Sequence, residues 1–247
     1  MECLKADFLE VWAASPNLPL ARFATRTRSI ASTGLDMLEF SPNAALIEEL
    51  RSFDSIVSWY GANRPEFRER VQELNLPFEF FTAVPPEDSP THAADFFVAQ
   101  VCLGRGVQAT PHIDCPPAAR GNFVVVHPFS SSPKKCWPLD RYRQLAASLN
   151  LPVRWLAGPE EHLPGAVHID DLYELACWLA TARVYIGNDA GITHLAAAVG
   201  VPVVALFGPT DPRIWAPRGP QVHVIAKPAL EDITVEEVLD VLVELQA

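Results

Sequence analysis

The segment SSSPKKC (130–136) combines three hydroxyl groups with two adjacent lysines, directly after a short apolar run. Ser130 and Ser131 offer hydroxyls and backbone amides, and Lys135 offers a positive charge where a helix is expected to begin. Unpaired N–H groups at a helix N-terminus also favour anions. The segment is therefore a candidate phosphate site. The alternative is a plain turn whose lysines are only solvated.

A second segment, GNDAGITHL (187–195), also follows an apolar run and opens an expected helix. Asp189 is placed to cap that helix, and Gly191 lets the backbone approach a ligand closely. Thr193 and His194 add a hydroxyl and an imidazole in the first turn. Together with unpaired amides, these groups favour a diphosphate. The alternative is a capped, buried helix in which the glycine serves packing against a sheet.

Common nucleotide and metal motifs are absent from the sequence. Neither segment contains the Gly-Lys-Ser/Thr of a P-loop or the Gly-x-Gly-x-x-Gly fingerprint. Asp189 and His194 lie about 140° apart around a helix, so they do not predict a shared metal. The 5 cysteines include no Cys-x-x-Cys pair and predict neither a disulfide framework nor a zinc site.

Two further loops carry charged side chains after expected strands. In AGPEEH (157–162), Glu160 or Glu161 is suited to binding the hydroxyls of a ribose, although loop glutamates are more often only solvated. In GPTDPR (208–213), we favour a rigid turn in which the Asp211 carboxylate bonds its own backbone. Other candidate ligand groups in this region are Thr210, Arg213 and Arg218.

Apolar, β-branched runs alternate with helical patterns throughout the second half of the chain. This alternation predicts a parallel sheet with helices on both faces, and ligands bind beyond the carboxyl ends of such strands. The expected strands are 123–127, 153–158, 166–169, 184–188, 201–208 and 223–226. The expected helices are 138–149, 171–182, 191–200 and 235–245.

The first half predicts a second α/β unit, and proline-rich residues 104–121 join the two halves. We place the boundary so that an N-terminal domain covers 1–115 and a C-terminal domain covers 116–247. The expected N-terminal strands are 28–32, 54–61 and 78–84, and the expected helices are 43–52, 64–75 and about 92–103.

Composition limits the expected partners and the expected cellular location. The 19 Lys and Arg against 30 Asp and Glu give a net charge of −11 over 247 residues, which argues against nucleic acid as the main partner. The sequence has neither an apolar run long enough to span a bilayer nor a signal-peptide pattern. A cytoplasmic protein is expected, and peripheral contact with the cytoplasmic membrane stays open.

Three ordered stretches resemble glycosyltransferase family 9, the heptosyltransferases of lipopolysaccharide core assembly. They are HPFSSSPKKCWPLDRYRQLA, YIGNDAGITHLAAAVGVPVVALFGPTDP and WAPRG, within residues 123–219. The resemblance implies an α/β, GT-B-like fold of two Rossmann-like domains with parallel sheets. It also implies that the C-terminal domain holds an ADP-heptose donor, with no cofactor besides this donor substrate.

The resemblance also implies roles for single residues. Lys135 sits where the family has a phosphate-contacting lysine, and Asp189 matches the aspartate that binds the donor sugar. Ala190 stands where the family often has Ser or Thr, so one hydroxyl contact is missing. The expected diphosphate site is Ser130, Ser131, Lys135, Gly191, Thr193 and His194; the ribose ligand is Glu160 or Glu161, between which spacing does not choose.

The start of the chain departs from the family pattern. Family members begin with a strand, a glycine-rich loop containing Gly-Asp, and a helix, and that aspartate is the proposed general base. This chain has no Gly-Asp step, and its first forty residues do not predict strand, loop and helix. We therefore expect an incomplete N-terminal domain with no identified catalytic base. The available carboxylates are Asp54, Glu66, Asp88 and Asp95.

These observations leave two functions to weigh. The first is an inverting, metal-independent glycosyltransferase that moves a heptose-like sugar from an ADP-sugar to a lipopolysaccharide core or related lipid-linked saccharide. The second is a truncated, catalytically inactive protein that binds a nucleotide sugar. An incomplete sheet would also leave an exposed edge or apolar patch, which favours association, for example as a homodimer.

Overall fold

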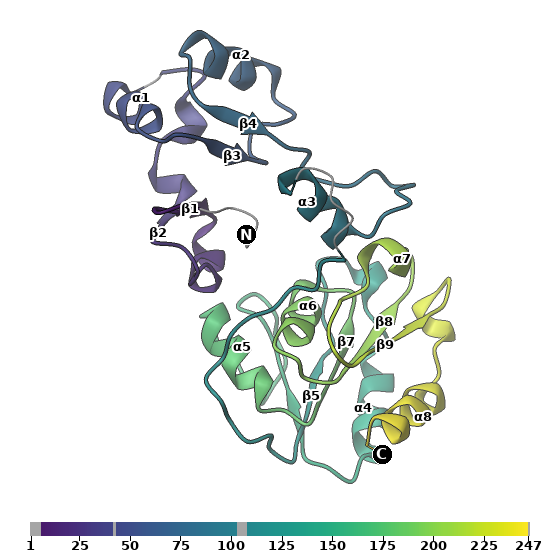
Figure 1. Ribbon diagram of the computed structural model, residues 1–247. Helices are drawn as coiled ribbons and strands as arrows, with labels where there is room; N and C mark the ends of the chain where they lie inside the picture. Colours follow the sequence, from purple (N-terminus) through teal and green to yellow (C-terminus); the bar gives the residue numbers. More distant parts are fainter. Residues whose placement is uncertain (1–5, 42, 103–107, 247) are drawn as a thin grey trace. The chain divides into compact units, whose positions relative to one another are not determined.

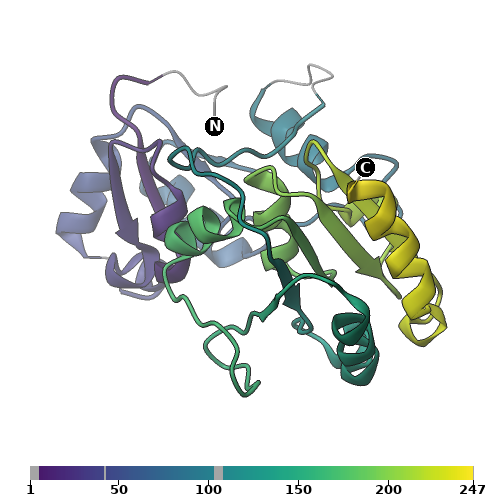
Figure 2. The same cartoon turned by 90° about the horizontal axis from the view of Figure 1, so that it is seen from below.

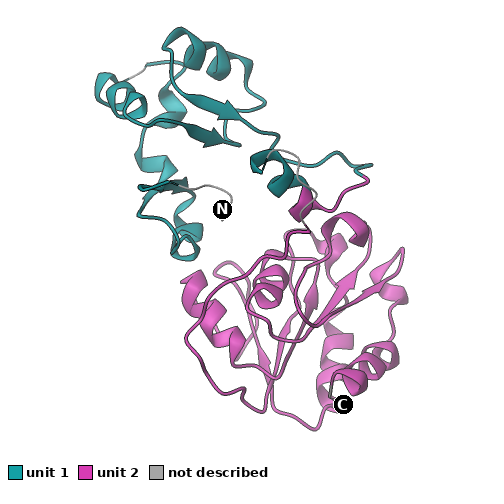
Figure 3. Ribbon diagram, in the orientation of Figure 1, with its two compact units in different colours: residues 1–89, 96–107 teal, residues 90–95, 108–247 magenta. Residues whose placement is uncertain are grey.

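The computed structural model describes residues 6–41, 43–102 and 108–246 (Figure 1). The chain divides into two compact units, one of Met1–Ser89 and Phe96–Val107, the other of Pro90–Asp95 and Gln108–Ala247 (Figure 3). Residues 108–115, assigned above to the N-terminal domain, bond to the second unit. The Ile113 N–H donates to the Ala198 carbonyl at 3.0 Å, and the Tyr173 hydroxyl donates to the Asp114 carbonyl at 3.0 Å.

A five-stranded parallel sheet organises the C-terminal unit, with the strand order β6-β5-β7-β8-β9. All residues of β5, β7 and β8 are buried, which explains why their sequences are continuous apolar runs without alternation. The expected strand at 166–169 is reduced to a single bridge between Leu156 and Val167. The strands are β5 Val124–His127, β6 Val153–Trp155, β7 Val184–Asn188, β8 Val203–Phe207 and β9 Val222–Ala226.

Helices cover both faces of this sheet, as the alternating pattern predicts. One pair, α4 and α8, packs together on one face, and α5 and α6 pack together on the other (Figure 2). The core beneath α4 and α8 joins Tyr142, Leu145 and Leu242 to the strand residues Val124 and Val204. The helices are α4 Leu139–Ser148, α5 Leu172–Ala180, α6 Gly191–Ala198, α7 Pro212–Trp215 and α8 Val235–Gln246, with 3-10 turns η4 Pro133–Lys135 and η5 Leu230–Asp232.

The N-terminal unit contains two separate pairs of parallel strands rather than one larger sheet. The pairs are β1 Glu10–Ala13 with β2 Arg26–Ser29, and β3 Ile56–Ser58 with β4 Phe78–Phe80. Its α-helices are α1 Ala44–Arg51, α2 Pro65–Glu73 and the larger part of α3 Ala93–Val101, whose residues 93–95 belong to the other unit. Its 3-10 turns are η1 Ser15–Leu20, η2 Ile30–Ser32 and η3 Leu35–Met37.

The sequence does not predict β1. Only Ala14 separates this four-residue strand from η1, which contains the two prolines Pro16 and Pro19. The region therefore does run from strand to helical turn to strand, contrary to expectation, but the connection after β1 contains no Gly-Asp step. Strand β2 begins before the expected 28–32, whose second half is the turn η2.

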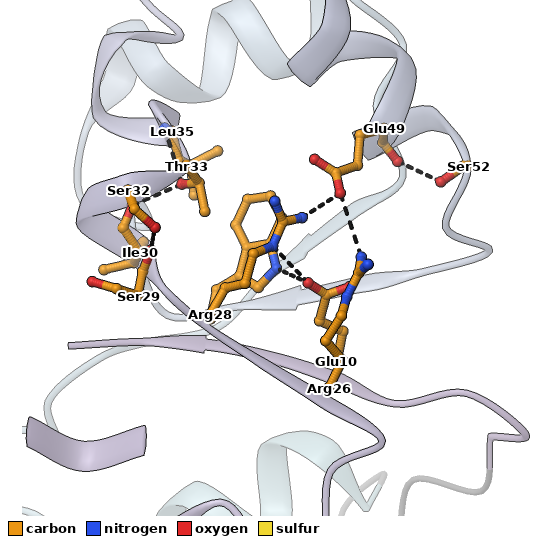
Figure 4. A network of polar contacts seen from close by, with 11 residues as sticks. Glu10, Arg26, Arg28, Ser29, Ile30, Ser32, Thr33, Leu35, Glu49 and Ser52 are labelled. Atoms are coloured by element: carbon orange, nitrogen blue, oxygen red, sulfur yellow. Dashed lines mark hydrogen bonds and ion pairs between the residues drawn. The ribbon is translucent and has the colours of Figure 1, made fainter. Parts of the chain in front are cut away.

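A charged network fastens β1 and β2 to helix α1 (Figure 4). Glu10 accepts from Arg26 at 2.5 Å and from Arg28 at 2.9 Å, and Arg28 also bonds to Glu49 on α1. The Trp12 indole N–H donates to Glu10 at 2.8 Å, and the Arg28 guanidinium lies 4.6 Å from the Trp12 ring centre. Burial raises the pKa of Glu10, but hydrogen bonds from Arg26, Trp12 and Arg28 outweigh it and leave the pKa lowered.

Two observations bear on the expected setting. Among the residues that the structure describes, no helix is both long and apolar enough to cross a membrane. Cys115, Cys136 and Cys177 are free thiols, whereas Cys102 is disulfide-bonded, a bond that the cysteine spacing does not predict.

Candidate functional site

The candidate site lies at the carboxyl edge of the five-stranded sheet. Strands β5 and β7 are neighbours, and His127 at the end of β5 pairs in register with Gly187. The loops that follow the two strands, 128–138 and 189–190, therefore leave the sheet side by side. Strand β6 borders β5 on its other side and sends the AGPEEH loop to the same edge.

Lys135 and Asp189, to which the resemblance assigns the phosphate and the donor sugar, lie in direct contact. The Lys135 Nζ is 2.7 Å from the Asp189 Oδ2, and their side chains are 31% and 10% exposed. Ser130 joins the same two loops, because its hydroxyl donates to the Asp189 carbonyl at 2.7 Å. Lys135 belongs to the short turn η4 rather than to the start of a long helix, and Ser131 is exposed beside it.

The prediction that Asp189 caps helix α6 is wrong. The N-cap residue is Ala190, which makes no side-chain capping bond. The Asp189 carboxylate instead turns toward Lys135, because an ion pair is available there. The first N–H groups of α6 are consequently left without a side-chain cap and can bind an anion.

Gly191 lies at the exposed start of α6. A Cβ atom added at Gly191 would meet no other atom within 4 Å. Helix–sheet packing therefore does not explain the glycine, and that alternative is wrong. The open space lies beside the backbone amides at the N-terminus of α6, where a ligand phosphate can approach closely.

Thr193 is the predicted site residue whose side chain is turned inward. It is fully buried, and its hydroxyl donates to the Asn188 carbonyl at 2.5 Å and lies 3.1 Å from the Tyr185 hydroxyl. Its hydroxyl thus fastens α6 to β7. His194, one residue later, is partly buried. Burial is the main reason that its pKa is lowered; nearby Asp189 raises the pKa, but burial together with His92 and Lys135 outweighs it.

Asn188 is a site residue that sequence reasoning does not single out. Its fully buried Oδ1 accepts from the Trp137 N–H and from the Tyr142 hydroxyl, both at 2.9 Å, and its Nδ2 donates to the Phe129 carbonyl at 3.4 Å. It therefore holds the lysine-bearing loop against the end of β7. An asparagine closing an otherwise apolar strand is the signal that points to such a role.

The two candidate ribose ligands differ in their surroundings. Glu160 is exposed, and Glu161 is partly buried. The Glu161 Oε2 is 2.9 Å from the His127 Nε2 and accepts from the Gly158 N–H at 2.6 Å. Burial raises the pKa of Glu161, but the hydrogen bonds from His127 and Gly158 outweigh it and leave the pKa lowered, so this carboxylate is charged at neutral pH.

In the GPTDPR loop, the charged side chains bond to one another and to the loop backbone. The Asp211 Oδ1 accepts from the Arg213 N–H at 2.8 Å and caps α7, which confirms the rigid-turn interpretation, and the Arg213 side chain pairs with the same carboxylate at 2.6 Å. The Arg218 guanidinium donates two hydrogen bonds, of 2.6 and 2.7 Å, to the Asp95 carboxylate. Those bonds are the main reason that the pKa of Asp95 is lowered, and they occupy a carboxylate considered above as a base.

Within the described part of the chain, no group of three or more His, Cys, Asp or Glu side chains is arranged to hold a metal ion. The groups gathered at the sheet edge are therefore a lysine, two carboxylates, hydroxyls and helix amides. Such a set can bind a phosphorylated, hydroxyl-rich molecule.

Comparison with known proteins gives a consistent family. Residues 98–239 match the family model for glycosyltransferase family 9 (heptosyltransferase). Lipopolysaccharide heptosyltransferase 3 of Escherichia coli is 28% identical over 118 residues, which are 39% of this chain and 34% of that protein. Lipopolysaccharide heptosyltransferase 1 of Pseudomonas aeruginosa is 35% identical over 108 residues, which are 36% of this chain and 30% of that protein. The matches span about a third of the length of these relatives.

Two solved structures show the same fold. E. coli ADP-heptose LPS heptosyltransferase II has a TM-score of 0.73 at 18% identity, covering 96% of this chain and 89% of that chain. E. coli heptosyltransferase WaaC with ADP has a TM-score of 0.66 at 17% identity, covering 95% of this chain and 89% of that chain. The predicted α/β, GT-B-like fold with parallel sheets is confirmed.

Proposed function

The chain belongs to glycosyltransferase family 9, and on this premise we propose that it transfers a heptose-like sugar from an ADP-sugar donor to a lipopolysaccharide core or related saccharide. The observation that carries the proposal is the Lys135–Asp189 pair, 2.7 Å apart beside the open amides of α6. A nucleotide sugar needs both charges: a cation for its diphosphate and an anion for its sugar hydroxyls.

In the proposed complex, the diphosphate binds Lys135, the Ser131 hydroxyl and the backbone amides of Gly191 and Ile192 at the start of α6. The Ser130 hydroxyl donates to the Asp189 carbonyl, so Ser130 contributes by holding the two loops together. Thr193 supports the site from inside the protein and does not touch the diphosphate, because its N–H donates to the Ala190 carbonyl at 3.0 Å and its hydroxyl donates to the Asn188 carbonyl. The Asp189 carboxylate accepts hydrogen bonds from the sugar. Neutral His194 adds a ring that packs or donates without competing with Lys135 for the phosphates.

The proposed reaction is a direct displacement that inverts the anomeric carbon. An acceptor hydroxyl oxygen forms a bond to that carbon while the bond from carbon to the diphosphate oxygen breaks; a base takes the hydroxyl proton and ADP leaves. Negative charge grows on the departing diphosphate, where Lys135 and the α6 amides stabilise it. We propose that these groups make a metal ion unnecessary.

The catalytic base is not assigned. Among the four carboxylates considered, Asp95 is held by Arg218 and is a poor proton acceptor. The other three, Asp54, Glu66 and Asp88, are exposed.

We assign the ribose to Glu161 rather than to Glu160. The Glu161 carboxylate is held in place by hydrogen bonds from His127 and Gly158, and its side chain is still 25% exposed. Glu160 is exposed, so holding its side chain against a ligand would cost more conformational entropy.

The second candidate function is binding of a nucleotide sugar without transfer. The observation that favours it is the connection after β1, which lacks the Gly-Asp step expected of the family's base. Binding of ADP together with no transfer to any saccharide acceptor would select this alternative.

The partners and setting that we propose are a lipid-linked saccharide acceptor, the cytoplasm with peripheral contact to the cytoplasmic membrane, and a homodimer. Large apolar side chains exposed in the N-terminal unit support association with an apolar surface. These are Phe8, Phe23, Met37 and Phe40, which are 50%, 55%, 48% and 73% exposed.

The experiment that tests the donor site is titration calorimetry with ADP. Lys135→Ala should weaken binding about tenfold or more, equivalent to about 1.4 kcal/mol. Lys134→Ala is the matched control, because this neighbouring lysine is exposed and makes no ion pair among the described residues. Absence of wild-type binding at millimolar ADP would contradict the proposed function. Transfer from ADP-heptose to a heptose-deficient lipopolysaccharide then tests catalysis.

A further inference from the structure

His127 is a buried polar residue to which the proposed reaction gives no role. It closes strand β5 and is 1% exposed, in register with Gly187 and packed against the Phe129 ring. Its Nε2 lies 2.9 Å from the Glu161 Oε2, whereas its Nδ1 is buried without a hydrogen-bond partner. Burying a polar group in this way is unfavourable, so the bond on the other ring nitrogen needs an explanation.

The contacts settle which ring nitrogen carries the proton. An ionised carboxylate can only accept hydrogen bonds, so the His127 Nε2 donates to Glu161. The Nε2–H of His127 is therefore the donor that fixes the Glu161 carboxylate, and the Nδ1 makes no contact that competes with this bond.

The hydrogen bonds to Glu161 are distributed unevenly over its two oxygens. Both His127 and the Gly158 N–H bond to Oε2. Oε1 accepts no hydrogen bond from the described residues, although the side chain is 25% exposed. The carboxylate is thus held by one oxygen and presents the other at the ligand edge of the sheet. A vicinal diol, which offers two O–H donors, suits a carboxylate oxygen held in this way.

We propose that His127 is a positioning residue for recognition of the donor's ribose, an inference that rests on the proposed function. Its Nε2–H fixes the Glu161 carboxylate so that Oε1 accepts hydrogen bonds from the 2′- and 3′-hydroxyls of the nucleotide. His127 itself does not touch the ligand. Without its bond, the glutamate would lose rotamer freedom on binding, and selectivity for the diol would fall.

The test compares the affinity of the full chain for ADP with its affinity for 2′,3′-dideoxy-ADP, by calorimetry. Wild type should prefer ADP about tenfold or more. His127→Asn, whose shorter amide cannot reach the Nε2 position, should lower this preference to about twofold or less. His127→Gln places an amide N–H near the Nε2 position and should restore most of it. His127→Leu places an apolar side chain of similar size in the buried position and should lower the preference as His127→Asn does. It provides a second test if His127→Asn does not fold.

Two controls separate positioning from general damage. Lys135→Ala should weaken the binding of both nucleotides by the same factor and leave the preference for ADP over 2′,3′-dideoxy-ADP unchanged. Glu160→Gln should change neither affinity nor preference. Thermal unfolding confirms that each variant is folded at the titration temperature.

The outcomes are distinguishable. If wild type binds ADP with the preference, but folded His127→Asn or His127→Leu keeps it, His127 is not a positioning residue and the donor site stands. If wild type binds both nucleotides equally, the ribose assignment and this inference fall together. If wild type binds neither, the proposed function itself fails.

Discussion

The Nζ of Lys135 lies 2.7 Å from the Oδ2 of Asp189, although 54 residues separate them in the chain. Neighbouring strands β5 and β7 bring them together, and the Asn188 side chain bonds to the loop that carries Lys135. A ligand diphosphate that binds Lys135 must compete with this aspartate. The pair therefore places the cation where it can be shared between the protein and a ligand.

Replacing Asp189 should separate binding from transfer. In Asp189→Asn, Lys135 loses its intramolecular partner and a nearby negative charge disappears, so ADP should bind at least as tightly as to wild type. Transfer from ADP-heptose should fall by about 100-fold, because one charged contact to the sugar is lost, roughly 2–3 kcal/mol. Calorimetry and a transfer assay measure the two effects. Weaker ADP binding by a stably folded variant would contradict the shared-cation interpretation.

Gly191 should matter for the ligand and not for the fold. Gly191→Ala adds a methyl group into open space, so the free energy of unfolding should change by less than about 0.5 kcal/mol. ADP affinity should fall about tenfold, because the methyl group occupies the space beside the α6 amides. The contrasting variant is Gly219→Ala, whose Cβ would lie 2.6 Å from the Ala197 carbonyl oxygen. That variant should be clearly destabilised in urea, whereas equal destabilisation of both would overturn the distinction.

Asn188 should be a stability residue. Asn188→Ala leaves the backbone N–H of Trp137 and the Tyr142 hydroxyl buried without acceptors. The free energy of unfolding should fall by about 2–4 kcal/mol. Tyr142→Phe removes one of these bonds together with its donor and should cost only about 1 kcal/mol. Urea unfolding followed by tryptophan fluorescence compares the two. A smaller loss for Asn188→Ala than for Tyr142→Phe is the result that would count against this account.

The charged network of the N-terminal unit should weaken in acid. The pKa of Glu10 is lowered in the folded chain, so its contribution is present above its unfolded pKa and is lost as pH falls through the lower folded value. Glu10→Gln should destabilise the chain by about 1 kcal/mol at pH 7. The difference from wild type should shrink below pH 4.5, the ordinary value for this group.

The control for Glu10 is Glu73→Gln. Glu73 forms a pair with Arg70 on the surface of α2, and its side chain is 63% exposed. Its loss should cost no more than a few tenths of a kcal/mol at either pH. A pH-independent difference between wild type and Glu10→Gln, measured by thermal unfolding, would show that packing rather than charge explains any loss.

Sequence periodicity predicts the C-terminal unit well because its three central strands, β5, β7 and β8, are buried on both faces. The expected strand 184–188 coincides with β7, and the helix expected at 235–245 is α8, one residue longer. The N-terminal unit is harder to predict, because its strands are only three or four residues long and apolar and polar residues alternate poorly along them. Strand β1 precedes a proline-containing 3-10 turn instead of an amphipathic helix, so neither signal is strong.

Within the site, residue type predicts which groups gather but not where each side chain points. Asp189 is a good capping residue by type, yet an ion pair with Lys135 is available and the carboxylate turns there. The Thr193 hydroxyl turns inward because the Asn188 carbonyl and the Tyr185 hydroxyl lie within reach. The choice between Glu160 and Glu161 depends on His127, which belongs to a different strand.

The bond between Arg218 and Asp95 has a consequence for how this protein can be shortened. The C-terminal unit is not continuous in the chain, since it includes Pro90–Asp95 as well as Gln108–Ala247. A fragment cut at residue 116 would leave Arg218, whose side chain is 19% exposed, without its carboxylate partner. A fragment that starts at residue 90 retains both ends of the bond. The beginning of α3 thus belongs, in energetic terms, to a domain whose remaining sequence starts more than ten residues later.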